Sequence, residues 1–231
     1  MQQGFRLHLR DDLHPWPQEP AEARAIQQAL PPPVVSPLPP GQAPRRLLGL
    51  DCAFPRRPAP HAVAAALLWD TEEGRVLWRQ RIRRPIPFPY RTGLLAFREL
   101  PLLLPLLAAL PLPIDAILVD GQGIAHPAGI GSAAHLALWI EEPVPVVGVA
   151  KSHLTGSFGP LPAEAGARTP LLHRGRIVGA VVRSRTGCRP LFVSPGGHVD
   201  VAGAVEIVLR SLRGRRLPEP LRLADRHSRD G

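Results

Sequence analysis

The sequence predicts an α/β protein built on one mixed sheet with helices on its faces. Three short apolar or alternating runs, at 46–54, 62–69 and 75–83, are separated by turn-forming residues, which indicates an antiparallel meander of three strands. After the meander, helical and strand patterns alternate, as is typical of parallel strands joined by helices. With 231 residues, 45% of them hydrophobic, the chain is long enough for one domain with a substantial core.

The first 44 residues differ in composition from the rest of the chain. Residues 19–30 predict one short helix, and residues 31–44, PPPVVSPLPPGQAP, predict a stiff proline-rich connector. We therefore divide the chain into an N-terminal leader, 1–44, which looks like an appendage, and a single domain, 45–231, that ends in a basic segment.

The third predicted strand has one cationic face. Side chains alternate along a strand, so Arg79, Arg81 and Arg83 share one face. The other face carries Val76, Trp78, Gln80 and Ile82.

The rest of the chain predicts alternating helices and strands. In order, these are a helix within 94–110, a buried strand at 115–120, a helix around 129–140, a strand at 144–150, an extended pair near 176–184 and 190–194, and a last helix near 200–213.

The charge balance points to polyanionic partners. There are 28 basic and 19 acidic residues, a net charge of +9, and this places nucleic acid first among the partner classes. Nearly all of the cations are arginine, because Lys151 is the single lysine. The C-terminal region from 174 onward is strongly basic, and we expect it to follow a phosphate backbone, although a solvated basic surface is the simpler interpretation.

Cysteine content and hydropathy favour a soluble protein of a reducing compartment. Cys52 and Cys188 are too few for a disulfide framework and have no metal-ligand spacing. The N-terminus has acids and prolines where a secretory peptide would be apolar. The most apolar segment, 100–112, is shorter than the ~20 residues that span a bilayer. We therefore expect a cytoplasmic monomer without membrane contact.

Two aspartates end predicted apolar strands, where a charge is costly unless a cation compensates its desolvation. Asp51 ends LLGLD, and Asp120 ends AILVD in a strand that the topology can place beside the first. Glu99, in AFRELP, lies in the helical region between them and can complete the group. Carboxylate oxygens at strand ends suit hard divalent cations, so we expect Mg²⁺, with Mn²⁺ as the alternative ion. A lone aspartate in such a position is more often a cap or an ion-pair partner.

Six segments, taken together in this order and spacing, resemble the endonuclease V family of repair nucleases that act at deaminated bases. The segments are GLDCAF at 49–54, PYRTGLLAFRELP at 89–101, LVDGQGIAHPAGIGSAAHLAL at 118–138, VGVAKSHL at 147–154, PLFVSPGGHVDVAGAV at 190–205 and RLPEPLRLAD at 216–225. The resemblance covers about 46–225.

The resemblance implies an RNase H-like fold and a metal-dependent nick in DNA. The expected cut is at the second phosphodiester bond 3′ to deoxyinosine, leaving 3′-hydroxyl and 5′-phosphate ends. Asp51, Glu99 and Asp120 match the metal-binding acids of the family. This agrees with the chemistry, because metals held by carboxylates can activate water and stabilise the leaving oxygen.

The same resemblance suggests how the lesion is recognised. Pro89, Tyr90, Arg91 and Thr92 match the strand-separating wedge, where Thr92 replaces the usual proline. Tyr90 would then stack in the space that the lesion base vacates. The positions that match the pocket for the everted base are Gly93, Leu95, Gly121 and His126. For Tyr90 and His126 the alternative interpretation is an ordinary structural side chain.

Lys151 and His198 complete the expected catalytic set. Lys151 matches the family's VAK lysine, which we expect to contact phosphate or the attacking water, the alternative being a solvated loop lysine. Where the family reads SPGHR, this chain reads SPGGHVD, so His198 stands one residue late. Either His198 or Asp200, an acid at a helix start, can then complete the site.

Two other functions remain open from the sequence. One is an inosine-specific ribonuclease or another RNase H-like nuclease, so the partner is DNA containing deoxyinosine or inosine-containing RNA. The other is a protein that binds inosine without cutting, although the three retained acids argue against it.

Overall fold

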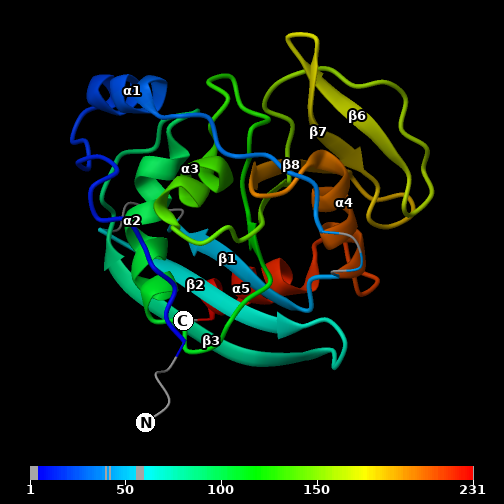
Figure 1. Ribbon diagram of the computed structural model, residues 1–231, viewed down its shortest axis with the longest axis horizontal. Helices are drawn as coiled ribbons and strands as arrows, with labels where there is room; N and C mark the ends of the chain where they lie inside the picture. Colours follow the sequence, from blue (N-terminus) through cyan, green and yellow to red (C-terminus); the bar gives the residue numbers. More distant parts are fainter. Residues whose placement is uncertain (1–4, 40, 42, 56–59, 231) are drawn as a thin grey trace.

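The computed structural model describes residues 5–39, 41, 43–55 and 60–230. Within them, eight strands form one mixed sheet in the order β3-β2-β1-β4-β5-β8-β7-β6, with helices on both faces (Figure 1). The strands are β1 (Arg46–Ala53), β2 (His61–Asp70), β3 (Arg75–Pro85), β4 (Ala116–Val119), β5 (Val146–Ala150), β6 (Arg168–His173), β7 (Arg176–Val182) and β8 (Leu191–Gly197). The helices are α1 (Pro20–Ala29), α2 (Leu95–Ala108), α3 (Ser132–Trp139), α4 (Val201–Arg210) and α5 (Glu219–Arg229).

The topology confirms the predicted mixed sheet. β1, β2 and β3 pair antiparallel as a meander, whereas β1, β4 and β5 are parallel. Because β1 and β4 run in the same direction, their carboxyl ends meet at one edge of the sheet. Asp51 and Asp120 therefore lie at the same edge.

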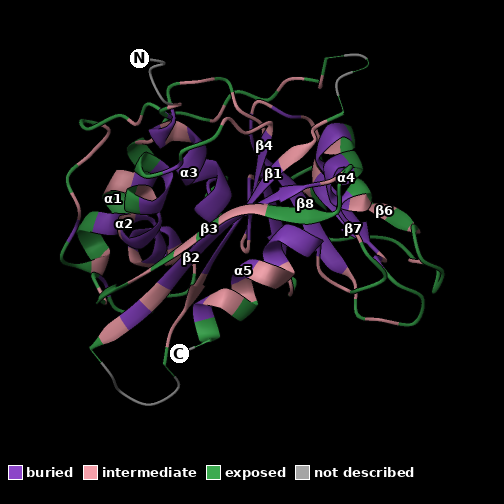
Figure 2. Ribbon diagram, turned by 90° about the horizontal axis from the view of Figure 1, so that it is seen from below, coloured by how far each residue is buried: buried purple, intermediate pink, exposed green. Residues whose placement is uncertain are grey.

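Two hydrophobic cores cover the two faces of the sheet. Leu48, Leu50 and Ile117 pack with α2 and α3 on one face. Leu47 and Leu118 pack with α4 and the start of α5 on the other face. Side chains alternate along each strand, so neighbouring leucines of β1 serve opposite cores. The central strands are consequently buried on both sides (Figure 2).

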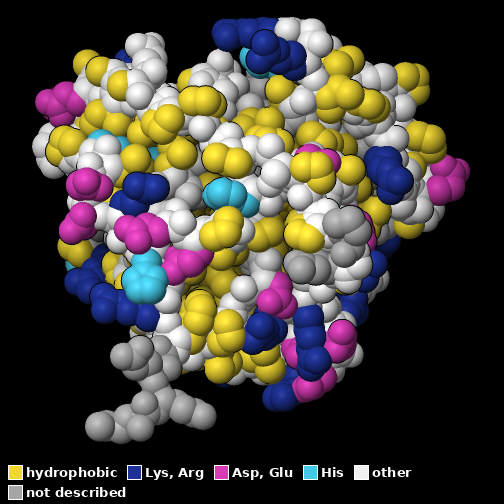
Figure 3. Space-filling model, viewed as in Figure 1, with side chains coloured by type: hydrophobic (Ala, Val, Ile, Leu, Met, Phe, Trp, Pro, Cys, Tyr) yellow, Lys and Arg dark blue, Asp and Glu magenta, His cyan; other side chains and the backbone are white. Residues whose placement is uncertain are grey.

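The N-terminal leader contacts the rest of the chain at several points. The predicted short helix is α1, and its Ala23 is buried with Phe97 of α2. Leu7 joins the core beneath α2 and α3, and Leu38 of the connector packs against the opposite core. On the face that Figure 3 shows, hydrophobic side chains, prolines included, are widespread, and lysine and arginine gather mainly toward the rim.

Strand β3 lies at an edge of the sheet and keeps one face open. Arg79, Arg81 and Arg83 are exposed, as the alternation predicts. A bulge opposite Leu68 and Trp69 changes the alternation before Trp78, so Leu77 packs against the core and Val76 lines a pocket together with Arg79. The prediction that Val76 shares the face of Trp78 is therefore wrong, because the bulge adds one residue to β3.

Two elements were not predicted, namely β6 and α5. β6 is an edge strand with a proline at 170 and an irregular burial pattern, which hides the alternation. α5 begins at a Pro-Glu-Pro sequence, 218–220, that resembles a loop, although proline at the first turn is compatible with a helix. The backbone of α5 at Pro220 approaches β1 so closely that a Cβ on Gly49 would lie 2.4 Å from it.

Candidate active site

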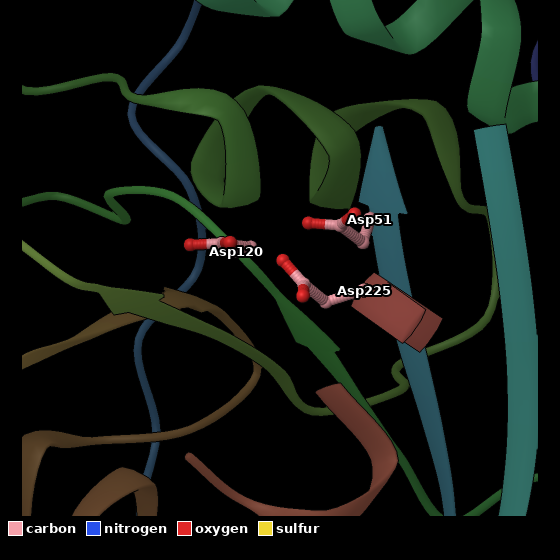
Figure 4. A group of neighbouring side chains, drawn as sticks. All are labelled: Asp51, Asp120 and Asp225. Atoms are coloured by element: carbon pink, nitrogen blue, oxygen red, sulfur yellow. The ribbon is translucent and has the colours of Figure 1, made fainter. Parts of the chain in front are cut away.

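Two of the predicted acids meet at the carboxyl edge of the sheet. Asp51 lies near the end of β1, and Asp120 directly follows β4, where its N–H donates to the Leu50 carbonyl oxygen at 3.3 Å. This parallel pairing brings the two side chains to the same point (Figure 4).

A third aspartate comes from α5. Asp51, Asp120 and Asp225 each offer a carboxylate oxygen, and these oxygens all lie within 4.8 Å of one another (Figure 4). One turn later on α5, Ser228 Oγ donates to Asp51 Oδ2 at 2.8 Å and fixes its orientation. Asp225 was missed in the sequence because its helix was not recognised, although it lies within the segment RLPEPLRLAD.

Glu99 stands beside this group of three. It is buried in α2 with 7% of its surface exposed, and its Oε2 atom has no hydrogen-bond partner among the described residues. Burial, with a contribution from Asp120, raises the pKa of Glu99 well above its usual value. Of the predicted acids, Asp51 and Asp120 thus belong to the oxygen cluster, whereas Glu99 is a buried neighbour that acts on it electrostatically.

Among the described residues, Lys151 is one of two cations that contact the acids, the other being Arg229, which donates to Asp225 Oδ1 at 2.8 Å. Lys151 follows β5, the strand next to β4, and its Nζ pairs with Asp120 and lies 3.1 Å from Asp225 Oδ1. Burial lowers the pKa of Lys151, but the two carboxylates outweigh that effect and raise it. Arg216 donates to the Lys151 carbonyl oxygen at 2.7 Å and so supports the backbone at this position.

The cluster holds more negative charge than its surroundings neutralise. Burial and the neighbouring Asp120 raise the pKa of Asp51 to about 7, against the opposing effects of Ser228 and Lys151. Oxygens bound to one divalent ion at about 2.0–2.6 Å lie within about 4–5 Å of each other, which the three aspartates satisfy. An all-carboxylate donor set, with a buried carboxylate oxygen beside it that has no partner among the described residues, therefore fits a hard divalent cation.

A cavity of about 320 Å³ opens beside the acids, and Asp120 and Lys151 line it. All four predicted pocket residues, Gly93, Leu95, Gly121 and His126, line it as well. So do Tyr90, Arg91 and Thr92 of the predicted wedge, and Tyr90 is 62% exposed. Pro89, the first residue of that segment, is exposed just ahead of the lining residues.

Gly93 and His126 lie next to each other in the wall of this cavity. Gly93 adopts φ +83°, in the left-handed region that favours glycine, and a Cβ there would point at the His126 ring 3.7 Å away. Burial lowers the pKa of His126 to about 4, so its ring is neutral at pH 7. His126 Nδ1 accepts a hydrogen bond from the Ala128 N–H at 3.1 Å, which leaves the proton on Nε2.

Gln27 is a cavity residue that the sequence did not indicate. Its Nε2 donates to the Gly93 carbonyl oxygen at 2.9 Å and to the Ile130 carbonyl oxygen at 3.0 Å. One side chain of α1 therefore ties together two walls of the cavity. Nothing in the local pattern of α1 distinguishes Gln27 from its neighbour Gln28.

His198 and Asp200 lie at the other end of the sheet. β8 runs antiparallel to β5, so Gly197 pairs with Val146 at the start of β5, far from Lys151 at its end. His198 donates its backbone N–H to the Val34 carbonyl oxygen at 2.6 Å, and Asp200 caps α4 by accepting from the Gly203 N–H at 2.7 Å. We therefore correct the prediction that either residue completes the acid cluster: strand direction, which the motif does not reveal, separates them.

Many arginines of the basic C-terminal region have structural partners. Arg183 donates to the Pro162 and Cys188 carbonyl oxygens, and Arg216 donates to three backbone carbonyls. Arg222 pairs with Glu219. These contacts reduce the number of cations that this region offers to a phosphate backbone.

Comparison with known proteins identifies the family. The sequence model described as Endonuclease V matches residues 34–226, which is most of the chain. The chain belongs to the endonuclease V family. It is therefore an endonuclease, as the six motifs predict, and its sheet is the RNase H-like fold of endonuclease V structures.

Endonuclease V relatives resemble the chain over nearly its whole length. Endonuclease V of Thermus thermophilus is 46% identical over 222 residues, covering 94% of this chain and 95% of the relative. The crystal structure of endonuclease V from Streptomyces avermitilis has a TM-score of 0.79 at 35% identity, covering 97% of this chain and 96% of that one. The structure of Ciona intestinalis endonuclease V in complex with a 24mer DNA containing an inosine followed by a ribo-adenosine shares the fold, with a TM-score of 0.75, 24% identity and coverage of 90% and 95%.

Among the described residues of this endonuclease V family member, no helix is both long enough and apolar enough to cross a bilayer.

Proposed function

We propose that this endonuclease V family member is a metal-dependent repair nuclease that nicks DNA at the second phosphodiester bond 3′ to deoxyinosine, leaving 3′-hydroxyl and 5′-phosphate ends. The observation that carries the proposal is that the acid cluster adjoins the cavity. Asp120 of the cluster and Lys151, which pairs with it, both line the cavity. A base held in that cavity places its neighbouring phosphates near the carboxylates.

Asp51, Asp120 and Asp225 would hold the divalent cation, with Glu99 beside them. We propose Mg²⁺ as the ion, with Mn²⁺ as the substitute. When bound, such an ion supplies an activated water and stabilisation of the leaving oxygen. Ser228 orients Asp51 through its hydrogen bond. Lys151, held between two of the carboxylates, brings its ammonium to the rim of the cavity, where it can bind the scissile phosphate.

The cavity suits a single everted base. Its volume of about 320 Å³ is at the small end of the range for ligand pockets. The absence of side chains at Gly93 and Gly121 leaves room for the base, while neutral His126 and Gln27 hold the surrounding loops. The exposed Tyr90 can stack in the space that the base leaves in the duplex. The inosine-containing DNA of the Ciona relative agrees with this assignment, which rests on the cavity and the family.

The proposal is tested by mapping the nick in a labelled duplex that contains one deoxyinosine. The purified full chain with Mg²⁺ should cut the inosine strand one nucleotide beyond the lesion and leave an otherwise identical deoxyadenosine duplex intact. Chelation of the metal should stop the reaction, and Mn²⁺ should restore it. A duplex that stays intact with both metals across a range of pH would contradict the proposal.

Matched RNA strands that contain inosine should be assayed in parallel. Faster cleavage of RNA than of DNA would assign the same site to ribonuclease activity. Lesion binding without cleavage of either substrate would identify an inosine-binding protein instead.

A further inference from the structure

Three arginines on β3 form a row of cations without acidic partners. Arg79, Arg81 and Arg83 are exposed, and among the described residues no carboxylate pairs with any of them. Other arginines nearby do have such partners, since Arg75 pairs with Glu73 and Arg226 with Asp230. Unpaired like charges repel one another, so a row of them favours an anionic partner. We refer to Arg79, Arg81 and Arg83 as the arginine ridge.

The ridge lies level with the acid cluster on the same face of the sheet. In the ladder, Asp51 of β1 is opposite Ala65 of β2, and Ala65 is opposite Arg81 of β3. Residues directly opposite each other share a face, and neighbouring strands lie about 4.8 Å apart, so the backbones at Asp51 and Arg81 are separated by about 10 Å.

Helix α5 connects the ridge to the cluster. It packs over β1 and β2 but leaves β3 open, as the largely exposed edge strand in Figure 2 shows. Ser228 of α5 donates to Asp51, and the neighbouring His227 carbonyl oxygen accepts from Arg81 Nη1 at 3.3 Å. The C-terminal turn of α5 is therefore a short bridge, with the acids on one side and the arginines on the other.

The spacing of the ridge matches a nucleic-acid backbone. Alternate residues of a strand are about 6.8 Å apart, which equals two base-pair rises of about 3.4 Å along one strand of a duplex. Arginine guanidinium groups bind phosphate oxygens through paired hydrogen bonds. Three arginines at this spacing match every second phosphate along one strand of the duplex.

The cavity and the ridge lie on opposite sides of the cluster. The cavity is lined by residues of α1, α2 and α3, whereas the ridge lies on the α5 face of the sheet. We propose that the arginine ridge binds the sugar-phosphate backbone of the duplex on the side of the scissile bond away from the everted base. This inference rests on the proposed function, in which cleavage is 3′ to the lesion, so the ridge holds the DNA downstream of the nick.

The experiment measures equilibrium binding of the full chain to two deoxyinosine duplexes by fluorescence anisotropy, with EDTA present to prevent cleavage. One duplex extends about 10 base pairs, one helical turn, 3′ of the lesion, and the other ends just beyond the cleavage position. The ridge variant combines Arg79→Gln, Arg81→Gln and Arg83→Gln. The control variant combines Arg6→Gln, Arg10→Gln and Arg168→Gln, three exposed arginines away from α5, and changes the net charge equally.

We expect the ridge variant to bind the extended duplex at least about tenfold more weakly than the unmodified chain. Its salt dependence should be shallower by about 0.9 for each phosphate that the ridge no longer neutralises. On the shortened duplex the two should bind alike, and the control variant should match the unmodified chain on both. Thermal unfolding checks that each variant is folded. The single variant Arg83→Gln, which removes no hydrogen bond within the described chain, should change the salt slope in the same direction.

Each other outcome overturns the inference. Unchanged affinity of the ridge variant for the extended duplex removes the ridge from the binding surface. An equal loss on both duplexes places the interaction elsewhere on the DNA. Self-association of the ridge variant at unchanged DNA affinity shows that the arginines protect an edge strand from pairing. Failure of the proposed function is distinct, because the unmodified chain would then not prefer deoxyinosine over deoxyadenosine duplexes.

Discussion

The acids at the amino ends of β1 and β4 are well compensated by hydrogen bonds, whereas the acids at the carboxyl ends are not. At the amino end, Asp115 accepts hydrogen bonds from the Arg45 and Arg46 N–H groups at 3.0 and 2.7 Å and from the Arg46 side chain at 3.1 Å. At the carboxyl end, Asp51 and Glu99 have raised pKa values, and Glu99 Oε2 has no partner among the described residues. Acids that are satisfied stabilise a fold, whereas acids held together without sufficient compensation indicate a binding site.

The largest expected effect comes from removing one acid at each end of the sheet and comparing the two variants. Asp51→Ala should lower the nicking rate by on the order of 10³-fold or more, because a ligand of the proposed metal is lost, and leave lesion binding in place. It should not lower the free energy of unfolding of the metal-free protein, since a costly buried charge is removed. Asp115→Ala should do the reverse and destabilise the fold by about 1–3 kcal/mol while the rate persists. Nicking assays and urea unfolding of both variants measure these differences. If the two variants lose rate and stability to the same extent, the distinction between the two kinds of acid is wrong.

Gly49→Ala should disturb the acid cluster at the carboxyl edge of the sheet by a steric clash. A Cβ on Gly49 would lie 2.4 Å from the Pro220 backbone, so α5 must move and carry Asp225 and Ser228 with it. We expect a loss of about 1–3 kcal/mol in the free energy of unfolding, together with slower nicking. Gly159→Ala is the matched control, because this exposed glycine is outside the left-handed region and the nearest atom to an added Cβ is Thr169 Oγ1 at 3.7 Å, so nicking and stability should be unchanged.

Tyr90→Ala should affect function without affecting stability. The side chain is 62% exposed, so its removal should change the free energy of unfolding by less than about 0.5 kcal/mol. Lesion binding should weaken by about tenfold, because stacking on one base contributes about 1–3 kcal/mol. Tyr90→Phe keeps the aromatic ring and should restore binding. If Tyr90→Ala binds inosine duplexes normally, the wedge assignment fails.

The smallest effect concerns pH at the amino end. The hydrogen bond from Arg45 lowers the pKa of Asp70 to about 2. Because this carboxyl has a lower pKa folded than unfolded, its contribution to stability is complete above about pH 4 and disappears as the pH falls through 2. Arg45 is well exposed, so we expect less than about 1 kcal/mol. Urea unfolding between pH 4 and 2 should show a shallower decline for Asp70→Asn than for the unmodified chain, and equal slopes would exclude this linkage.

The sequence predicts that an acid belongs to the site when the acid ends a recognisable apolar strand. Asp51 and Asp120 were identifiable because each ends an apolar run, and parallel strands bring such ends together. Asp225 was not, since its position depends on how a polar helix packs across the sheet. His198 was misplaced because a motif gives spacing along the chain but not the direction in which its strand runs. β6 was missed because, at an edge, burial is too irregular to produce a pattern.

The hydrogen bond between Ser228 and Asp51 joins residues 177 positions apart in the chain. A contact of this span forms late in folding, because both segments must be synthesised and the sheet between them must form before the contact can stabilise the fold. A nascent polypeptide that has folded only its first strands therefore displays Asp51 and Asp120 without their third aspartate. Nuclease activity should therefore appear only after translation has supplied α5 and its aspartate.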